Sequence, residues 1–470
     1  MTTDESGPSS SPQAVRWSFL RSFYFWRNLI VAFLVISPLL IRLWCLSKVP
    51  PAPIPFDVDE FCRIEIEPGQ NAFDYFREAT RLKEAVDADY KARGIKFEWD
   101  GYEAVMASGW SGATDSQKQW LIDRSEAMQV WRRGTDCSDS LFASPLATSF
   151  DDMVTALQSF QELVGMVQCD GMWLESEGRL LDAAENYLAI LRSSDLLGRH
   201  GFVTQKLHGM WNYRVAAARL IRWSEDSRLG AVELCSVLKQ VRAVNQKSEP
   251  PSAGLKIDYL FTMKALSRTG WSIPLGLIEK NEKFEPYAST GMEALLWVVG
   301  EPDVASRTFT HVLTNHLREV DKPLAERRPM AQPPIVGLFR PPGELSSQSF
   351  PPALIERAVQ RSIVANQTLE MFSMYDQEVG QDRSRRVGLE LVLAAQIYFR
   401  DHGEFPAETS DLIPDYIDSW PADPLQSTAD RLMQYEREST TSARIHSLGA
   451  RGFDVTLQSR TPTAKEPAVP

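Results

Sequence analysis

The stretch Leu29–Leu46, LIVAFLVISPLLIRLWCL, decides how the rest of the chain is organised, because it is the one run apolar enough to leave water for a bilayer. Counted from Asn28, the run covers 19 residues, and a helix of that length spans about 28 Å, close to the hydrocarbon thickness of a bilayer. Membrane helices tolerate a proline such as Pro38, and Arg42 lies close enough to the end to reach the headgroups. The sequence therefore predicts a transmembrane helix over residues 28–46, in contact with lipid.

The charges before this helix predict its orientation. Arg16, Arg21 and Arg27 outnumber the acidic residues there, and the positive-inside rule places such a segment in the cytoplasm. Residues 1–27 are thus expected to form a disordered cytoplasmic tail, and the body lies outside. A cleaved signal peptide and a buried helix of a soluble protein are the alternatives, but no small-x-small cleavage site follows the apolar run. Residues 47–56 form a proline-rich spacer.

Composition narrows the class of protein. The chain has 470 residues, 43% of them hydrophobic, which suffices for two or three packed domains. Its net charge is −12, and beyond residue 48 it carries 45 basic against 60 acidic side chains. Nucleic-acid phosphates need a basic surface, so no nucleic-acid partner is predicted.

Cysteines leave one question open. Cys45 belongs to the apolar run, and Cys62, Cys137, Cys169 and Cys235 follow it. Their wide spacing excludes a compact zinc site. Free thiols and disulfides are both compatible with a chain large enough to fold without covalent links.

Residues 57–380 have the apolar periodicity of a helical body. Asn71 is placed to cap the first long helix and Gly94 to end it. Each helix needs a neighbour to cover its apolar face, so we predict a mainly α, membrane-anchored array of helical hairpins. The predicted helices are Asn71–Arg93, Asp115–Arg133, Phe150–Glu175, Leu180–Leu197, Val203–Trp223, Leu229–Asn245, Leu255–Leu266 and Phe309–Leu324.

One predicted hairpin, at about residues 165–195, carries a more specific pattern. Small, turn-forming and aromatic residues recur there at fixed offsets, at Gly171, Leu174, Gly178, Leu180, Ala183 and Tyr187. The segment resembles a tetratricopeptide unit, in which small residues sit where two helices cross and a large one fills the gap. A shift by 34 residues recovers little of the pattern, so a degenerate array is favoured over a true repeat domain.

Two sets of residues, one acidic and one of histidines, could suggest a metal site. The acidic opening contains Asp57, Asp59, Glu60, Glu65 and Glu67, which alternate with apolar residues. This alternation predicts the wet face of a short strand or extended segment, without the glycine turn of a calcium loop. His311 and His316 are five residues apart, about 140° round a helix, and cannot face one ion. No metal ligand is predicted.

Residues 383–460 are expected to form a small α+β domain. A helix over Arg383–Arg400 precedes a Gly-x-Phe-Pro loop and strands at Leu432–Glu436, Ala443–Leu448 and Val455–Leu457. The pattern-carrying residues are Tyr398, Gly403, Phe405, Pro406, Leu412, Ile413, Tyr416, Pro421, Asp423, Pro424, Tyr435, Ser447 and Gly449.

This order of elements resembles the soluble part of type II secretion major pseudopilins. That family's late loop binds calcium through aspartates, whereas this one keeps Asp454 and has Arg451 where an aspartate is expected. Whether the domain binds calcium stays open. We interpret Asp423 as a cap of backbone amides. The tail, residues 461–470, is predicted to be disordered.

Function is the least determined property. No nucleophile elbow, phosphate loop, dinucleotide fingerprint or zinc-protease motif occurs, so catalytic residues are unknown and no cofactor is predicted. The chain as a whole is similar to uncharacterised bacterial envelope proteins with a single anchor, which implies the inner membrane. We predict a membrane-tethered, extracytoplasmic binding or scaffolding protein with an envelope protein partner. An accessory of a secretion or pilus-like apparatus, and an envelope hydrolase that uses distant carboxylates, are the alternatives.

Overall fold

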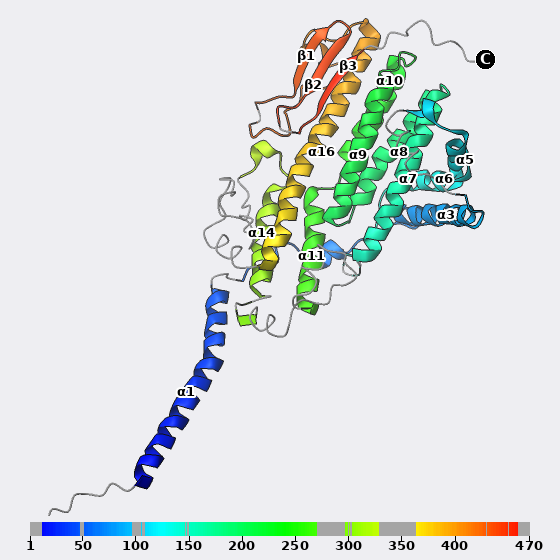
Figure 1. Ribbon diagram of the computed structural model, residues 1–470. Helices are drawn as coiled ribbons and strands as arrows, with labels where there is room; N and C mark the ends of the chain where they lie inside the picture. Colours follow the sequence, from blue (N-terminus) through cyan, green and yellow to red (C-terminus); the bar gives the residue numbers. More distant parts are fainter. Residues whose placement is uncertain are drawn as a thin grey trace, which may run out of the picture. The chain divides into compact units, whose positions relative to one another are not determined.

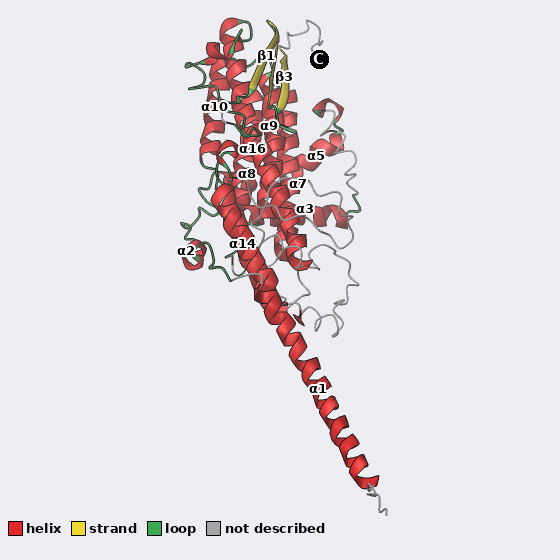
Figure 2. Cartoon of the chain, turned by 90° about the vertical axis from the view of Figure 1, so that its left-hand side faces the viewer, coloured by secondary structure: helices red, strands yellow, loops and turns green. Residues whose placement is uncertain are grey.

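The computed structural model describes residues 12–47, 51–95, 105, 109–145, 147, 150–269, 297–298, 300, 303–328, 363–428, 430–449 and 451–458. This part is mainly helical, with a small antiparallel sheet near the C-terminus, as predicted (Figures 1 and 2). Residues 1–11 and the predicted tail at 461–470 lie outside the described residues. Backbone contacts divide the chain into two units.

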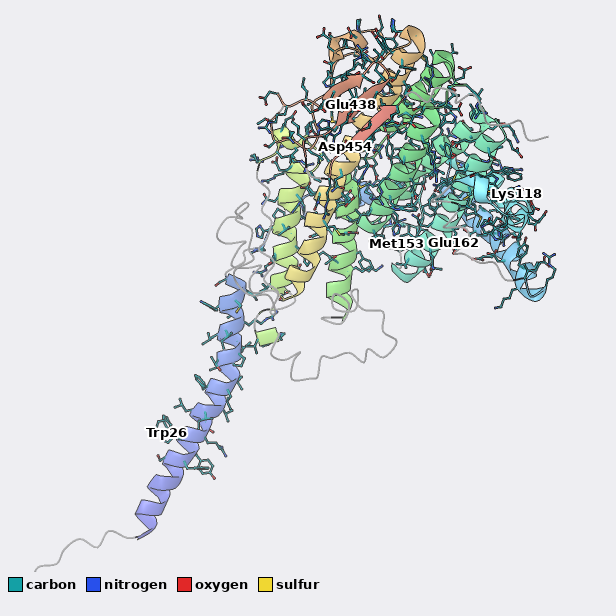
Figure 3. All side chains as sticks on the ribbon, turned by 45° about the horizontal axis from the view of Figure 1, so that its top comes forward. Trp26, Lys118, Met153, Glu162, Glu438 and Asp454 are labelled. Carbon is teal, nitrogen blue, oxygen red and sulfur yellow. The ribbon has the colours of Figure 1, made fainter. Side chains whose placement is uncertain are left out.

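The first unit comprises Met1–Pro53, Lys264–His311 and Pro333–Thr368. Its helix α1 (Pro12–Ser47) is long and apolar enough to cross a membrane, and Trp26 points outward from it (Figure 3). The helix starts earlier than predicted, so residues 12–27 are helical where we expected a disordered tail. No glycine or proline interrupts the chain between Pro12 and Pro38, and a nucleated helix extends at little cost.

Within this unit, the C-terminal end of α1 packs on the start of α14 (Asp303–Glu319). Arg42 pairs with the Asp303 carboxylate, donates to the Trp297 carbonyl at 2.6 Å and lies 4.7 Å from the centre of the Trp297 ring. Arg307 donates to the Leu46 carbonyl at 3.0 Å. Arg42 thus has a carboxylate partner in the protein, besides the lipid headgroups expected from the sequence.

The second unit comprises Ile54–Met263, Val312–Gln332 and Leu369–Pro470. The acidic opening at its start contains a short helix, α2 (Val58–Cys62), where the sequence predicted a short strand or extended segment. The Asp57 side chain accepts from the Glu60 N–H at 3.0 Å and starts this helix. In α3 (Ala72–Ala92) the predicted cap is present, because Asn71 accepts from the Phe73 N–H.

The helix predicted over Asp115–Arg133 is broken in two, α5 (Asp115–Asp123) and α6 (Ser125–Thr135). Arg124 occupies the break, and its buried guanidinium donates to the Trp120 carbonyl at 3.1 Å and to Asp87. Gly134, the residue just after the predicted helix, lies inside α6. Short 3-10 turns are η1 (Trp110–Gly112), η2 (Leu324–Glu326) and η3 (Thr409–Leu412).

The helices α7 (Phe150–Ser176), α8 (Leu180–Gly198), α9 (Val203–Ser224), α10 (Ala231–Gln246) and α11 (Pro251–Thr269) follow the predicted order. Gly178 turns the chain between α7 and α8 with φ +79°. All five cysteines lie among the described residues, and none of them forms a disulfide.

One helix of 40 residues, α16 (Ile363–His402), joins the region predicted as body to the region predicted as C-terminal domain. The sheet packed near its end has the order β1 (Gln434–Ser439), β2 (Ser442–His446) and β3 (Asp454–Gln458), with antiparallel neighbours (Figure 1). These strands match the three predicted ones. Body and sheet belong to the same unit, and Arg400 on α16 donates to three carbonyls that follow α9 or end it, those of Ser224, Asp226 and Leu229.

Candidate functional site

A cavity of about 380 Å³ lies in the second unit, between the end of α8, the start of α9, the link from α10 to α11, and the middle of α16. Pockets for small molecules have volumes of about 300–1,000 Å³, so its size suits a small ligand. Its lining consists of Ser194, Asp195, Gly198, Lys206, Met210, Asn245, Ser248, Glu249, Pro250, Pro251, Asp321, Tyr375, Val379, Asp382, Arg383 and Arg386.

Small residues bring helices α8 and α9 together at one wall of this pocket. A Cβ atom on Gly209 of α9 would overlap the backbone oxygen of Ser194 on α8, so only glycine fits there. The aliphatic stem of Lys206 runs between Gly198 and Gly254, where an added Cβ would lie 3.0 Å and 2.8 Å from its carbons. The close crossing therefore buries the Lys206 stem and directs its ammonium toward the pocket rim.

Two carboxylates of the pocket are engaged by the chain itself. Glu249 accepts from Lys206 at 2.6 Å, and the His200 N–H lies 3.4 Å and 3.3 Å from its two oxygens. Asp195 accepts from the Arg199 guanidinium at 2.5 Å and from the Glu249 N–H at 3.2 Å. Good geometry of this kind offsets the cost of taking paired charges out of water. These groups form the fixed frame of the pocket.

Asp382 of α16 is different, because only one of its oxygens is engaged. Its Oδ2 accepts from Arg386 Nε at 2.6 Å, one turn further along the helix. Its Oδ1 is buried and accepts no hydrogen bond from any residue that the structure describes. A buried polar atom without a partner costs about 1–3 kcal/mol. In the described part of the chain it is the one buried carboxylate oxygen in this state.

A network behind Asp382 holds its partner in place. The Arg386 guanidinium lies 4.3 Å from the centre of the Tyr213 ring. The Tyr213 hydroxyl donates to Asn245 Oδ1 at 3.0 Å, and the Asn245 amide donates to Glu390 at 2.6 Å. Burial raises the pKa of Tyr213, so the phenol stays a neutral donor. The network fixes Arg386 and, through it, the orientation of the Asp382 carboxylate.

The next residue, Arg383, contributes a positive charge. Its guanidinium donates to the carbonyls of Val320, Asp321 and Lys322 at 3.3, 3.0 and 2.8 Å, which lie just beyond the end of α14. Burial lowers the pKa of Arg383, but a guanidinium stays protonated at physiological pH. Among the described residues its hydrogen-bond partners are these three carbonyls, and the nearby carboxylates of Asp321, Asp376 and Asp382 oppose the lowering of its pKa.

The remaining wall of the pocket is largely apolar and includes Met210, Val379, Pro250 and the ring of Tyr375. The buried Tyr375 hydroxyl donates to the Pro251 carbonyl at 3.0 Å, which fixes the ring. Its pKa is raised well above the ordinary value, first by burial and then by nearby carboxylates, Asp258 foremost. The phenol is therefore neutral.

Asp258 on α11 lies at the N-terminus of α9, where its Oδ1 accepts from the Val203 N–H at 3.3 Å. Burial raises its pKa to about 7, and the bond from Val203 opposes that shift. Asp258 thus changes protonation near neutral pH, unlike an ordinary surface carboxyl.

A second cavity, of about 500 Å³, lies between α3, the junction of α5 and α6, and α7. Lys83 pairs there with Asp87 at 2.9 Å and with Glu162. Arg124 pairs with Asp87 at 2.5 Å and lies between the Tyr90 and Trp120 rings, whose centres are 4.7 and 4.4 Å away. The charges of Lys83, Arg124, Asp87 and Glu162 neutralise one another, so this network stabilises the packing of the helices.

The residues considered from the sequence as metal ligands are not brought together. His311 and His316 lie on α14 as predicted, and burial lowers the pKa of His316 to about 4, so this ring is neutral. Within the residues that the structure describes, no group of three or more His, Cys, Asp or Glu side chains is placed to hold a metal ion. Asp454 pairs with Arg444 across β3 and β2, 2.6 Å apart.

Asp423 has the structural role expected of it. Its buried carboxylate accepts from the Leu425 N–H at 3.0 Å, from the Leu448 N–H at 2.7 Å and from the Ser447 hydroxyl at 2.8 Å. It therefore joins the Pro-x-Asp-Pro turn to the loop after β2.

The pocket residues on α16 were missed from the sequence. The expected boundary between body and C-terminal domain, after residue 380 and before residue 383, falls inside α16 beside Asp382. One signal was present: Asp382 and Arg386 are four residues apart, the spacing of an ion pair on a helix.

Comparison with known proteins gives no match: no family model, no curated protein and no solved structure is similar to this chain.

Proposed function

We propose that this chain is a single-pass, membrane-tethered binding protein, and that the pocket between α8, α9, α10 and α16 is its binding site. The observation that carries the proposal is a cavity of ligand size whose lining includes Asp382, a buried carboxylate with one oxygen that accepts no hydrogen bond from the described residues. A ligand that donates a hydrogen bond to this oxygen would satisfy it, and the gain contributes to affinity.

The tether is supported by α1, which is long and apolar enough to cross a bilayer and whose described side chains are mostly exposed. A cleaved signal sequence can be equally long and apolar, but no small-x-small cleavage site follows the apolar run, which favours an uncleaved membrane anchor. We propose the bacterial inner membrane, with the N-terminus in the cytoplasm and the second unit outside, because basic residues precede the apolar run.

Binding is favoured over hydrolysis by the state of the carboxylates. A hydrolase of the predicted kind needs one free carboxylic acid and one free base across the substrate. Every oxygen of Asp195 and Glu249 already accepts from the chain, Asp321 Oδ1 accepts from the Ser252 N–H at 2.9 Å, and Asp382 Oδ2 accepts from Arg386, so each carboxylate of the lining already has a partner in the chain. The alternative role, as an accessory of a secretion apparatus, is supported only by the resemblance of residues 383–460 to type II secretion major pseudopilins.

Native mass spectrometry of the full-length protein, extracted from its membrane in detergent, tests the proposal. Met210 lines the pocket, and Met210→Trp fills part of it. We expect a small-molecule adduct on the wild-type protein that is absent from Met210→Trp and retained by Val232→Trp, a change at a highly exposed position on α10. Absence of any adduct from the wild type, or an equal adduct in all three proteins, would contradict a pocket-bound ligand.

We also propose an envelope protein as a partner, because stacked helices offer extended surfaces on which a protein can bind. Chemical crosslinking in intact membranes tests it. We expect one protein to be recovered reproducibly with the wild-type chain, and recovery of none would remove the scaffolding part of the proposal while leaving the pocket to its own test.

A further inference from the structure

We propose that the chain meets the bilayer at a second place besides α1, through residues at the start of α14 and just before it, with the Trp297 ring among the lipid headgroups and Asp303 as the counter-ion of Arg42. These residues form the interfacial segment, which consists of Trp297, Gly300, Asp303, Val304 and Arg307. Its partner is the phospholipid headgroup layer on the side where α1 ends, and this assignment rests on the proposed membrane tether.

The interfacial segment covers one side of the last turns of α1. Cys45 is buried there, and a Cβ atom on Gly300 would lie 3.3 Å from Cys45 Cβ and 3.6 Å from Leu46 Cδ2. The φ of Gly300 is +95°, a conformation that glycine adopts without strain. Val304 packs on Leu46, and Arg307 donates to the Leu46 carbonyl at 3.0 Å. The segment is therefore held directly against the end of the anchor.

The depth of this contact follows from the position of the anchor. Residues 22–36 of α1 are exposed throughout, as expected of a helix surface that faces lipid. Residues 28–46 are the proposed membrane span, and residues 42–46 occupy its last roughly 6 Å. Segments bound at a membrane interface bury about 5–10 Å into the boundary between headgroups and acyl chains. Side chains that pack on residues 42–46 thus lie within the headgroup region.

The charge of Arg42 is compensated at this depth. A guanidinium near the hydrocarbon is costly unless it pairs with another group. The Arg42 side chain is only 14% exposed, pairs with the Asp303 carboxylate and donates to the Trp297 carbonyl at 2.6 Å. The pair brings no net charge to the interface, so the chain itself supplies the counter-ion of Arg42.

Trp297 supplies the side chain that faces the lipid. Its ring lies 4.7 Å from the Arg42 guanidinium, yet 43% of the residue is exposed. Tryptophan is enriched at membrane interfaces, because its ring is apolar and its indole N–H can bond to headgroups or water. Trp44, near the same end of α1, is 52% exposed. The two tryptophans therefore mark one interface from two different parts of the chain.

Photocrosslinking of the full-length protein tests the contact, in vesicles of dioleoyl-phosphatidylcholine and dioleoyl-phosphatidylglycerol. Benzoyl-phenylalanine is placed at residue 297, at residue 33 as the lipid-facing control on α1, or at residue 232 as the exposed control on α10. We expect phospholipid adducts at residues 33 and 297 and none at residue 232. An adduct at residue 33 without one at residue 297, or equal adducts at residues 297 and 232, would overturn the inference and leave the tether standing. No adduct at residue 33 would contradict the tether and the inference with it.

A pair of variants tests the counter-ion. Asp303→Leu leaves Arg42 unpaired and is expected to lower the adduct at residue 297 at least threefold, because breaking a shielded ion pair is costly. The double change Arg42→Leu with Asp303→Leu removes both charges and should restore the adduct. Asp182→Leu, which breaks an exposed pair with Arg179 on α8, is the control and should leave the adduct unchanged. An unchanged adduct in Asp303→Leu, or no recovery in the double variant, would contradict the role given to Asp303.

Discussion

The ring of Tyr187 on α8 packs directly against Gly171 on α7: a Cβ atom at residue 171 would lie 2.6 Å from Tyr187 Cε1. Tyr187 is fully buried, and Ala183, one turn earlier, is buried as well. Glycine is therefore required where α7 and α8 cross. The small residue and the large one thus meet where the sequence placed a helix crossing.

Gly171→Ala is expected to destabilise the protein. Overpacking costs about 1–3 kcal/mol, and the better helix propensity of alanine offsets up to about 1 kcal/mol of it. Denaturant unfolding of the detergent-solubilised chain measures the difference. Gln158→Ala, at an exposed position of the same helix, is the control and should leave the midpoint unchanged. An unchanged midpoint in Gly171→Ala would mean that the two helices do not cross so closely.

Asp423→Ala should loosen the end of the sheet. The substitution leaves the Leu425 and Leu448 N–H groups and the Ser447 hydroxyl without their acceptor, at about 1–3 kcal/mol for each buried group. We expect faster hydrogen exchange at the amides of β2. Asp454→Ala removes an exposed pair with Arg444, which is worth about 0–1 kcal/mol, and should change exchange little. Equal effects of the two changes would count against the capping role.

Asp258 predicts a pH dependence of stability. Its pKa is about 7 in the folded protein against 3.8 ordinarily, so between these values the folded state binds more protons and stability falls as pH rises. Asp258→Asn avoids the buried charge and keeps an acceptor for the Val203 N–H. At pH 8 it should be more stable than wild type by roughly 4 kcal/mol, and at pH 4 the two should agree.

Thermal unfolding at the two pH values measures this difference. His316 has the opposite effect, since its pKa is lowered to about 4, but it is present in both proteins and cancels. A constant difference between Asp258→Asn and wild type at both pH values would show that Asp258 does not titrate near neutrality.

Topology can be tested with a reporter that is active only in the cytoplasm. If Arg16, Arg21 and Arg27 hold the N-terminus inside, the reporter fused after Pro470 should be silent and the same reporter fused before Met1 should be active. Activity of the C-terminal fusion would reverse the orientation.

The helices and strands were predictable where local chemistry decides them. The Asn71 cap and the left-handed Gly94 bound α3 as expected, with φ +67° at the glycine. The break at Arg124 was not predictable, because it depends on Asp87, Tyr90 and Trp120 closing round one guanidinium. The same limit applies to the pocket: residues 195, 249 and 382 line it only because α8, the link from α10 to α11, and α16 pack together, which no local pattern encodes.

The most direct test of the binding function places a photoreactive benzoyl-phenylalanine at residue 210 or, as a control, at residue 232, in the full-length protein in its native membrane. Met210 lines the pocket and Val232 is exposed on α10. After irradiation, mass spectrometry of the peptides should show a small-molecule adduct at residue 210 and none at residue 232. No adduct at residue 210, or the same adduct at both positions, would contradict the account.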